Sequence, residues 1–361
     1  MSDNSTTMML ERFKLEVGTP SFFGGIFTTK PKGVHMTEKV EIDIEREEED
    51  IAVPVQHITS SYRDNEFDQA VNKGFTPPII KEAFGVVIWE QIKRQPGANP
   101  FENPDFARNA GERAFNGVRV LANKVRRTVE LMGSQVLQTG VINVPDFGGN
   151  TAFSLDFGMR SGHKITATTW AANGSTGTPL ADISGAAQIV RKDGKKRCNQ
   201  LVFGTGAMQR FLANPGVQLQ LDKFKINLGA LTPGMRSETE DATFYGYIWI
   251  DQYQYEMWLL DSYYRHPQTG VMTPYMNDNK VIVRSTKARM DLSWGLIPRL
   301  VPSDARAQQF LPGRLTALDL GMDLQPYSYI PSDGESLMIN MGARPLCIPV
   351  EIDSYACLTV F

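Results

Sequence analysis

The sequence has few of the residues that mark disulfide-bonded, metal-binding or membrane proteins. Its three cysteines are too few and too widely spaced for a disulfide framework or a zinc site, which favours a reducing compartment. The four histidines lie far apart, none at a recognised metal spacing from another ligand, so they are interpreted as surface or packing residues. No apolar run approaches the roughly 20 residues that a membrane span needs. We therefore expect a protein without bound metal or cofactor that is soluble when made.

The chain also has no strong charge bias. It holds 37 basic and 40 acidic residues, a formal net charge of −3, so any contact with DNA must be local or weak. The N-terminal MSDNSTTMMLERF does not have the basic-then-apolar order of a signal peptide. With 361 residues, the chain is long enough for two domains, or for one domain with large insertions.

Catalytic motifs are incomplete. The GTG at Gly204 to Gly206 follows an expected strand and opens an expected helix, where a phosphate would sit, but it completes neither GxGxxG nor GxxxxGK[ST]. A tight strand-to-helix turn is the simpler interpretation. No GxSxG elbow marks a serine nucleophile, and nothing singles out a general acid among the carboxylates. We expect no catalytic residue and no enzyme activity.

What the chain does contain, close to its start, is a long acidic segment, TEKVEIDIEREEEDIAVPV, from Thr37 to Val55. Val40, Ile42 and Ile44 alternate with acids, which predicts a strand with one apolar face. The acids of interest are Glu41, Asp43, Glu45, Glu47, Glu48, Glu49 and Asp50. A polar stretch then leads to a second extended segment, FTPPIIKEAFGVVIW, and we expect the two segments to form a long hairpin-like loop.

The strongest helix signal covers residues of about 104–139. Asn103-Pro104 gives a start and Gly140 a stop, and apolar residues recur at three- and four-residue steps between them. Such a helix is about 50 Å long, which suits a structural spine, with a kink at Gly111 or Gly117 left open. Its charged residues of interest are Arg119, Lys124, Arg126, Arg127 and Glu130.

The helix charges have two interpretations. Arg126 and Arg127 can pair with Glu130 within the helix, as a solvated face, or can face a neighbouring molecule. A second basic stretch, RKDGKKR from Arg191 to Arg197, is interpreted as a charged turn that closes a helix. After it, the run FYGYIWIDQYQYEMWLL predicts two strands that meet in a turn at Asp251-Gln252.

The order of these pieces resembles the lambda-like major capsid proteins of tailed bacteriophages, the phage major capsid protein E family. The resemblance spans most of the chain. The strings that carry it are FFGGIFTTKPKGVHMTEKVEID, FTPPIIKEAFGV, RRTVELMGSQVLQTG, LVFGTGAMQRFLANPGV and PLCIPVEIDSYACLTV. It implies an α+β fold of the Hong Kong 97 type. The implied parts are an N-terminal arm (1–36), an extended loop (37–90), a peripheral domain (91–156 and 337–361, with the spine helix) and an axial domain (157–336).

The resemblance also implies a function. Such a chain self-assembles into hexamers and pentamers of an icosahedral shell around double-stranded DNA, as a virion capsid assembled in the host cytoplasm. The acidic loop then clasps a neighbouring subunit, whose spine helix contributes Arg119, Arg126, Arg127 and Glu130. Candidate DNA-facing residues are Arg12, Lys14, Lys30 and Lys32. Expected partners are a separate scaffolding protein, a portal protein and a decoration protein, with no membrane.

Two alternatives stay open at this point. A bacterial nanocompartment shell protein shares the fold but holds enzymes instead of DNA. A β-rich hydrolase that uses two of the acids belongs to another functional class altogether.

Overall fold

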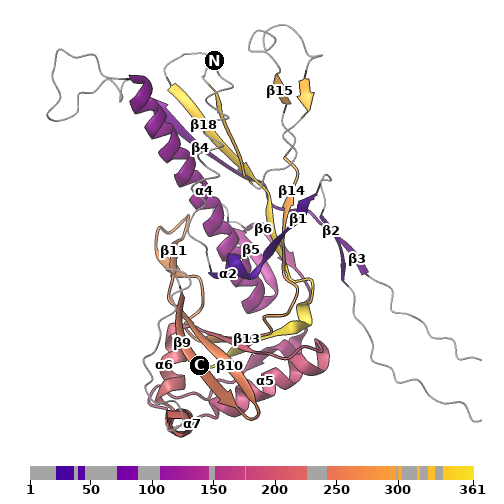
Figure 1. The fold of residues 1–361 in the computed structure, drawn as a ribbon, viewed down its shortest axis with the longest axis vertical. Coiled ribbons are helices and arrows are strands. Elements are labelled where there is room, and N and C mark those ends of the chain that lie inside the picture. Colours follow the sequence, from indigo (N-terminus) through magenta and orange to yellow (C-terminus); the bar gives the residue numbers. More distant parts are fainter. Residues whose placement is uncertain are drawn as a thin grey trace, which may run out of the picture.

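The computed structural model of the chain describes residues 22–35, 40–44, 71–87, 106–145, 151–174, 176–225, 242–297, 300–302, 315–317, 324–329 and 336–361. One long helix, α4, rises from a base made of a sheet with helices beneath it, and the C-terminus lies in that base (Figure 1). None of the described helices is both long and apolar enough to span a bilayer.

The predicted spine helix is confirmed as α4, Phe106–Thr139. The apolar positions that predicted it, from Ala114 through Val125 to Val136, are fully buried. Its C-terminus is set by Gly140, whose N–H donates to the Val136 carbonyl at 2.8 Å and whose φ is +72°. The helix is continuous through Gly117, where a Cβ would lie 2.5 Å from the Phe84 ring, so this glycine provides packing space and not a break.

Three small sheets pack against α4. β18 is the central strand of the first sheet and buries Ile339 and Met341. The first sheet contains β17 (Gln325–Tyr329), β18 (Ser336–Ala343) and β4 (Ile80–Val87). The second contains β1 (Thr28–His35), β14 (Asp291–Gly295) and β19 (Pro345–Ile348). The third contains β5 (Val141–Pro145) and β6 (Thr151–Asp156). The short helix α2 (Phe22–Ile26) packs directly on α4.

The base is a six-stranded sheet in the order β7-β20-β13-β8-β10-β9. Its strands are β7 (Lys164–Thr166), β20 (Tyr355–Thr359), β13 (Lys280–Arg284), β8 (Gln200–Phe203), β10 (Tyr253–Leu260) and β9 (Ala242–Ile250). The helices packed on it are α5 (Pro179–Asp193), α6 (Thr205–Ala213) and α7 (Pro215–Lys225).

Alternation along the central strands of this sheet creates two cores. Val202 of β8 and Ile282 of β13 join the apolar cluster that contains the buried face of α4. Their neighbours Leu201, Phe203 and Val281 point to the opposite face, into the cluster that α5, α6 and α7 cover. The sheet is thus the middle layer between the spine helix and the helices of the base.

The extended loop differs from the expectation in its return strand. The acidic strand is present as β2 (Val40–Ile44), but it pairs antiparallel with β3 (Val71–Phe75), which lies in the stretch expected to be a polar link. The segment that was expected to return, β4, pairs instead with β18. Pro77 and Pro78 separate β3 from β4, and the Pro77 carbonyl accepts a hydrogen bond from Arg344. Because the prolines interrupt the ladder, the chain leaves the hairpin before the Ile- and Val-rich strand begins.

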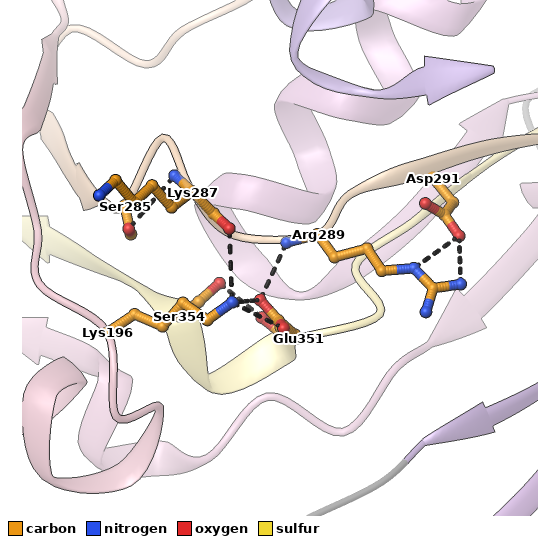
Figure 2. A network of polar contacts seen from close by, with 7 residues as sticks. All are labelled: Lys196, Ser285, Lys287, Arg289, Asp291, Glu351 and Ser354. Carbon is orange, nitrogen blue, oxygen red and sulfur yellow. Dashed lines mark hydrogen bonds and ion pairs between the residues drawn. The ribbon is translucent and has the colours of Figure 1, made fainter. Parts of the chain in front are cut away.

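A polar network fixes the junction between the α5–β8 turn and the short helix η3 (Ile352–Ser354) (Figure 2). The Lys196 ammonium lies 2.7 Å from the Glu351 carboxylate and donates to the Lys287 carbonyl at 3.3 Å. The Arg289 N–H donates to the same carboxylate at 2.9 Å. The Ser354 hydroxyl donates to the Glu351 carbonyl at 2.6 Å.

Among the histidines that the structure describes, His163 has a clear structural role. Its ring is fully buried, with Nδ1 2.7 Å from the Tyr355 carbonyl and Nε2 3.0 Å from the Asp193 carboxylate. It therefore joins the end of α5 to the last strand of the chain, β20. The interpretation of this histidine as a packing residue is confirmed.

Candidate assembly interface

The exposed side of α4 presents basic residues. Arg119, Lys124 and Arg127 are exposed there together with the apolar Val120, while the opposite side of the helix is buried. Lys124 forms an ion pair of 2.9 Å with Glu82 of β4, which ties this face of the helix to the neighbouring sheet. Arg119 and Arg127 are therefore exposed, and their contact with another subunit stays a prediction.

Arg126 is less available than its neighbours. The side chain is half-buried, and its Nη1 donates to the Asn123 amide oxygen at 3.3 Å. Removal from water lowers the pKa of this guanidinium below its ordinary value. Arg126 is thus partly buried on the helix surface, whereas Arg119 and Arg127 are exposed.

Glu130 does not face outward as expected. Its side chain is only 3% exposed, and its two carboxylate oxygens accept the backbone N–H groups of Phe23 and Gly24, at 2.8 and 2.7 Å. The first N–H groups of a helix have no partner within that helix, so this carboxylate caps α2. The sequence could not show this, because the partners lie more than 100 residues earlier in the chain.

The base of the extended loop is anchored in its own subunit. Val40 is fully buried, and its register partner Phe75 packs against Phe157 with ring centroids 5.4 Å apart. Glu41 and Asp43 lie in β2 opposite Gly74 and Asn72.

The remaining predicted residues fall into two groups. Lys30 and Lys32 lie in β1, in the stretch where its pairing with β14 is irregular. The others lie outside the described residues: Arg12, Lys14, Glu45, Glu47, Glu48, Glu49 and Asp50.

An exposed apolar surface on β9 is a feature that sequence analysis missed. The two strands and the turn at Asp251 were predicted and are present as β9 and β10. Tyr247 and Trp249 are nevertheless 54% and 38% exposed, although the intervening Ile248 is buried. Among the described strands, β9 forms the outer edge of the sheet. Two exposed aromatic side chains on an outer strand make this edge a candidate contact surface. The signal in the sequence was the aromatic alternation itself.

The GTG turn is structural. A Cβ at Gly204 would lie 2.2 Å from the Asn277 carbonyl oxygen, and the Ala207 N–H already donates to the Asp278 carbonyl at 2.7 Å. The start of α6 is therefore packed against the chain just before β13, which confirms the interpretation as a tight turn. Within the described residues, no group of three or more His, Cys, Asp or Glu side chains is placed to hold a metal.

Comparison with solved structures identifies the architecture. The chain matches a protein assigned as the capsid protein of a prophage in Escherichia coli CFT073, with a TM-score of 0.63 at 14% sequence identity. The match covers 100% of this chain and 99% of that one. The chain has the Hong Kong 97-type capsid fold. The α+β capsid fold expected from the sequence is thereby confirmed.

Other matches are weaker. A phage-related protein from Bordetella bronchiseptica RB50 has a TM-score of 0.48 at 11% identity, with 97% and 95% of the two chains covered. A chain from the capsid structure of Cyanophage P-SCSP1u has a TM-score of 0.47 at 10% identity, with 95% and 89% of the two chains covered. No protein-family model and no curated protein sequence matches the chain.

Proposed function

We propose that this chain is the major capsid protein of a tailed bacteriophage and self-assembles into the hexamers and pentamers of an icosahedral shell around double-stranded DNA. The observation that carries the proposal is the capsid fold, matched over nearly the full length of both chains to a prophage capsid protein. A fold alone does not fix a function, so the proposal also rests on the surfaces that this chain presents.

The first such surface is the pair formed by the acidic loop and α4. The loop carries a run of acids beyond an anchored base at Val40, while α4 exposes Arg119 and Arg127. In the proposed shell, the loop of one subunit lies across the spine helix of the next, and Arg126 contributes at the edge of that contact. Each exposed ion pair contributes only about 0.2–1 kcal/mol, so stability comes from many contacts repeated around a closed, symmetric assembly.

The second surface is the aromatic edge of β9. Tyr247 and Trp249 expose apolar area on the outer strand β9, and aromatic residues are enriched in interfaces between subunits. In the proposed shell, this edge belongs to the axial domain, residues 157–336, and contacts a neighbour within the same capsomer. The proposed arm is residues 1–36, the proposed loop 37–90 and the proposed peripheral domain 91–156 and 337–361. Within these bounds, β4 pairs with β18 outside the loop hairpin, and β20 joins the sheet of the base.

The proposed partners are a separate scaffolding protein and a portal protein, which act in head assembly, and a decoration protein, which would bind the finished shell. Assembly takes place in the host cytoplasm. Packaged DNA is contacted without sequence preference, with Arg12, Lys14, Lys30 and Lys32 as candidate residues of the arm. We propose no enzymatic role, no metal and no cofactor.

Sedimentation velocity of the purified protein tests the proposal. Shells sediment as particles of many subunits, whereas a β-rich hydrolase sediments as a monomer or a small oligomer. Nuclease digestion of particles recovered from infected cells distinguishes a phage capsid from a nanocompartment shell. Protected DNA supports the phage capsid, and an enzyme cargo without DNA supports a nanocompartment instead.

A further inference from the structure

Helix α5 ends in a turn that concentrates basic side chains. The seven residues from Arg191 to Arg197 include five basic side chains and one acidic one, in a chain whose net charge is −3. Arg191 and Lys192 lie in the last turn of the helix, where positive charge interacts favourably with the helix dipole and stabilises the helix. Lys195 and Arg197 lie beyond the end of α5, so the helix dipole does not account for them. We call these seven residues the basic turn.

The backbone of the basic turn is held on both sides. The Gly194 N–H donates to the Val190 carbonyl at 2.7 Å, and a Cβ at Gly194 would lie 2.2 Å from the Asp353 carbonyl oxygen. Lys195 follows with a φ of +53°. Lys196 is then fixed by its ion pair with Glu351 (Figure 2). The exposed cations on either side of Lys196 are therefore presented from a defined surface.

Tyr253 at the start of β10 positions two of the arginines. The Arg197 guanidinium carbon lies 4.3 Å from the ring centroid and that of Arg191 lies 5.7 Å away. Arg191 also donates a hydrogen bond to the Tyr253 hydroxyl. A ring of this kind restricts a guanidinium without neutralising its charge, so both side chains remain positive and exposed.

The carboxylates next to the basic turn have partners of their own. Asp193 lies 3.0 Å from the His163 ring and 3.5 Å from Arg160. Arg160 also lies 3.6 Å from the Asp353 carboxylate. Glu351 is bound by Lys196, as described above. Each of these acids thus has a cation or a histidine beside it, and Arg191, Lys192, Lys195 and Arg197 are exposed.

We infer that the basic turn binds the phosphate backbone of double-stranded DNA without sequence preference. β8, which follows the turn, lies between β13 and β10, so it offers no open strand edge on which an extended acidic peptide could pair. A positively charged surface without a free strand edge suits a partner that is recognised by its negative charge alone, as the phosphates of DNA are. This inference rests on the proposed function, because it places the basic turn on the inner side of the shell.

Fluorescence anisotropy with a labelled duplex DNA of mixed sequence tests the inference on the full-length protein. The turn variant is Lys192→Gln/Lys195→Asn, since asparagine tolerates the positive φ at residue 195. The control variant, Lys81→Gln/Arg265→Gln, removes two exposed charges elsewhere. We expect the turn variant to lose about tenfold in affinity at about 50 mM salt, and its salt slope to become shallower by about 1.8, for two lost phosphate contacts. The control should change by no more than about twofold.

Three results would overturn the inference. They are wild-type affinity in the turn variant, an equal loss in both variants, and displacement of DNA by a peptide of residues 37–55 that binds the turn more tightly. Circular dichroism checks that both variants fold, and sedimentation reads assembly separately. Absence of shells from the wild-type protein would defeat the proposed function, whereas the comparison of the two variants still decides whether the turn binds DNA.

Discussion

The Glu130 carboxylate of α4 accepts the backbone N–H groups of both Phe23 and Gly24, so one side chain of the spine helix holds the start of α2. We expect Glu130→Gln to lower the free energy of unfolding by about 2 kcal/mol, because an amide keeps one acceptor and sets a donor against the other N–H group. Urea unfolding followed by circular dichroism measures this loss.

Glu82→Gln is the matched control for that prediction. Glu82 pairs with Lys124, whose side chain is half exposed to solvent, so this change should cost less than about 1 kcal/mol. Equal losses in the two variants would show that the Glu130 cap contributes no more than a surface ion pair.

Gly140 ends the spine helix in a conformation that other residues avoid. Gly140→Ala should destabilise the subunit by more than about 2 kcal/mol, because φ is +72° and the new Cβ would lie 2.4 Å from Met159 Cβ. Gly185→Ala is the control, since a Cβ there meets nothing within 4 Å on α5. That change should stabilise the helix by about 0.5–1 kcal/mol. Thermal unfolding of the two variants should therefore shift in opposite directions, and a neutral Gly140→Ala would contradict the account of this turn.

The buried cysteines should lower the free energy of unfolding as the pH becomes alkaline. Burial raises the pKa of Cys198 and of Cys357 to about 12 from an ordinary value of 9.0. Because folding favours the neutral thiol, the stabilisation is fully present below about pH 9 and is lost as the pH rises toward 12. The urea midpoint should fall over this range, and it should fall less in a Cys198→Ala/Cys357→Ala variant. Rapid reaction of these thiols with a disulfide reagent at pH 8 in the folded protein would contradict their burial.

The acidic loop is predicted to contact a neighbouring subunit. Glu41→Lys/Asp43→Lys/Glu45→Lys should leave the subunit folded but block assembly, because the reversed charges meet the cations exposed on α4. Adding Arg119→Glu/Arg127→Glu should restore part of the assembly. Circular dichroism reports folding and sedimentation reports shells. Val40→Ala serves as the contrast, since this buried residue should weaken the subunit itself. Normal shells from the triple variant would refute an intersubunit role for these acids.

Local patterns predicted the parts of this fold that local interactions decide. The spine helix followed from apolar periodicity and from Gly140, and the β9–β10 pair followed from its aromatic alternation. The prediction of the loop's return strand was wrong. The true return strand, Val71–Phe75, has little apolar character of its own and forms because it pairs with β2. The cap made by Glu130 and the arginine contacts of Tyr253 depend on residues far apart in the chain, which no spacing rule connects.

A cryo-electron microscopy reconstruction of the particles formed by the wild-type protein tests the central claim most directly. We expect closed icosahedral shells of hexamers and pentamers, in which the loop that contains β2 and β3 crosses α4 of an adjacent subunit near Arg119 and Arg127. A protein that remains monomeric under all assembly conditions, or a shell in which that loop folds back on its own subunit, would contradict it.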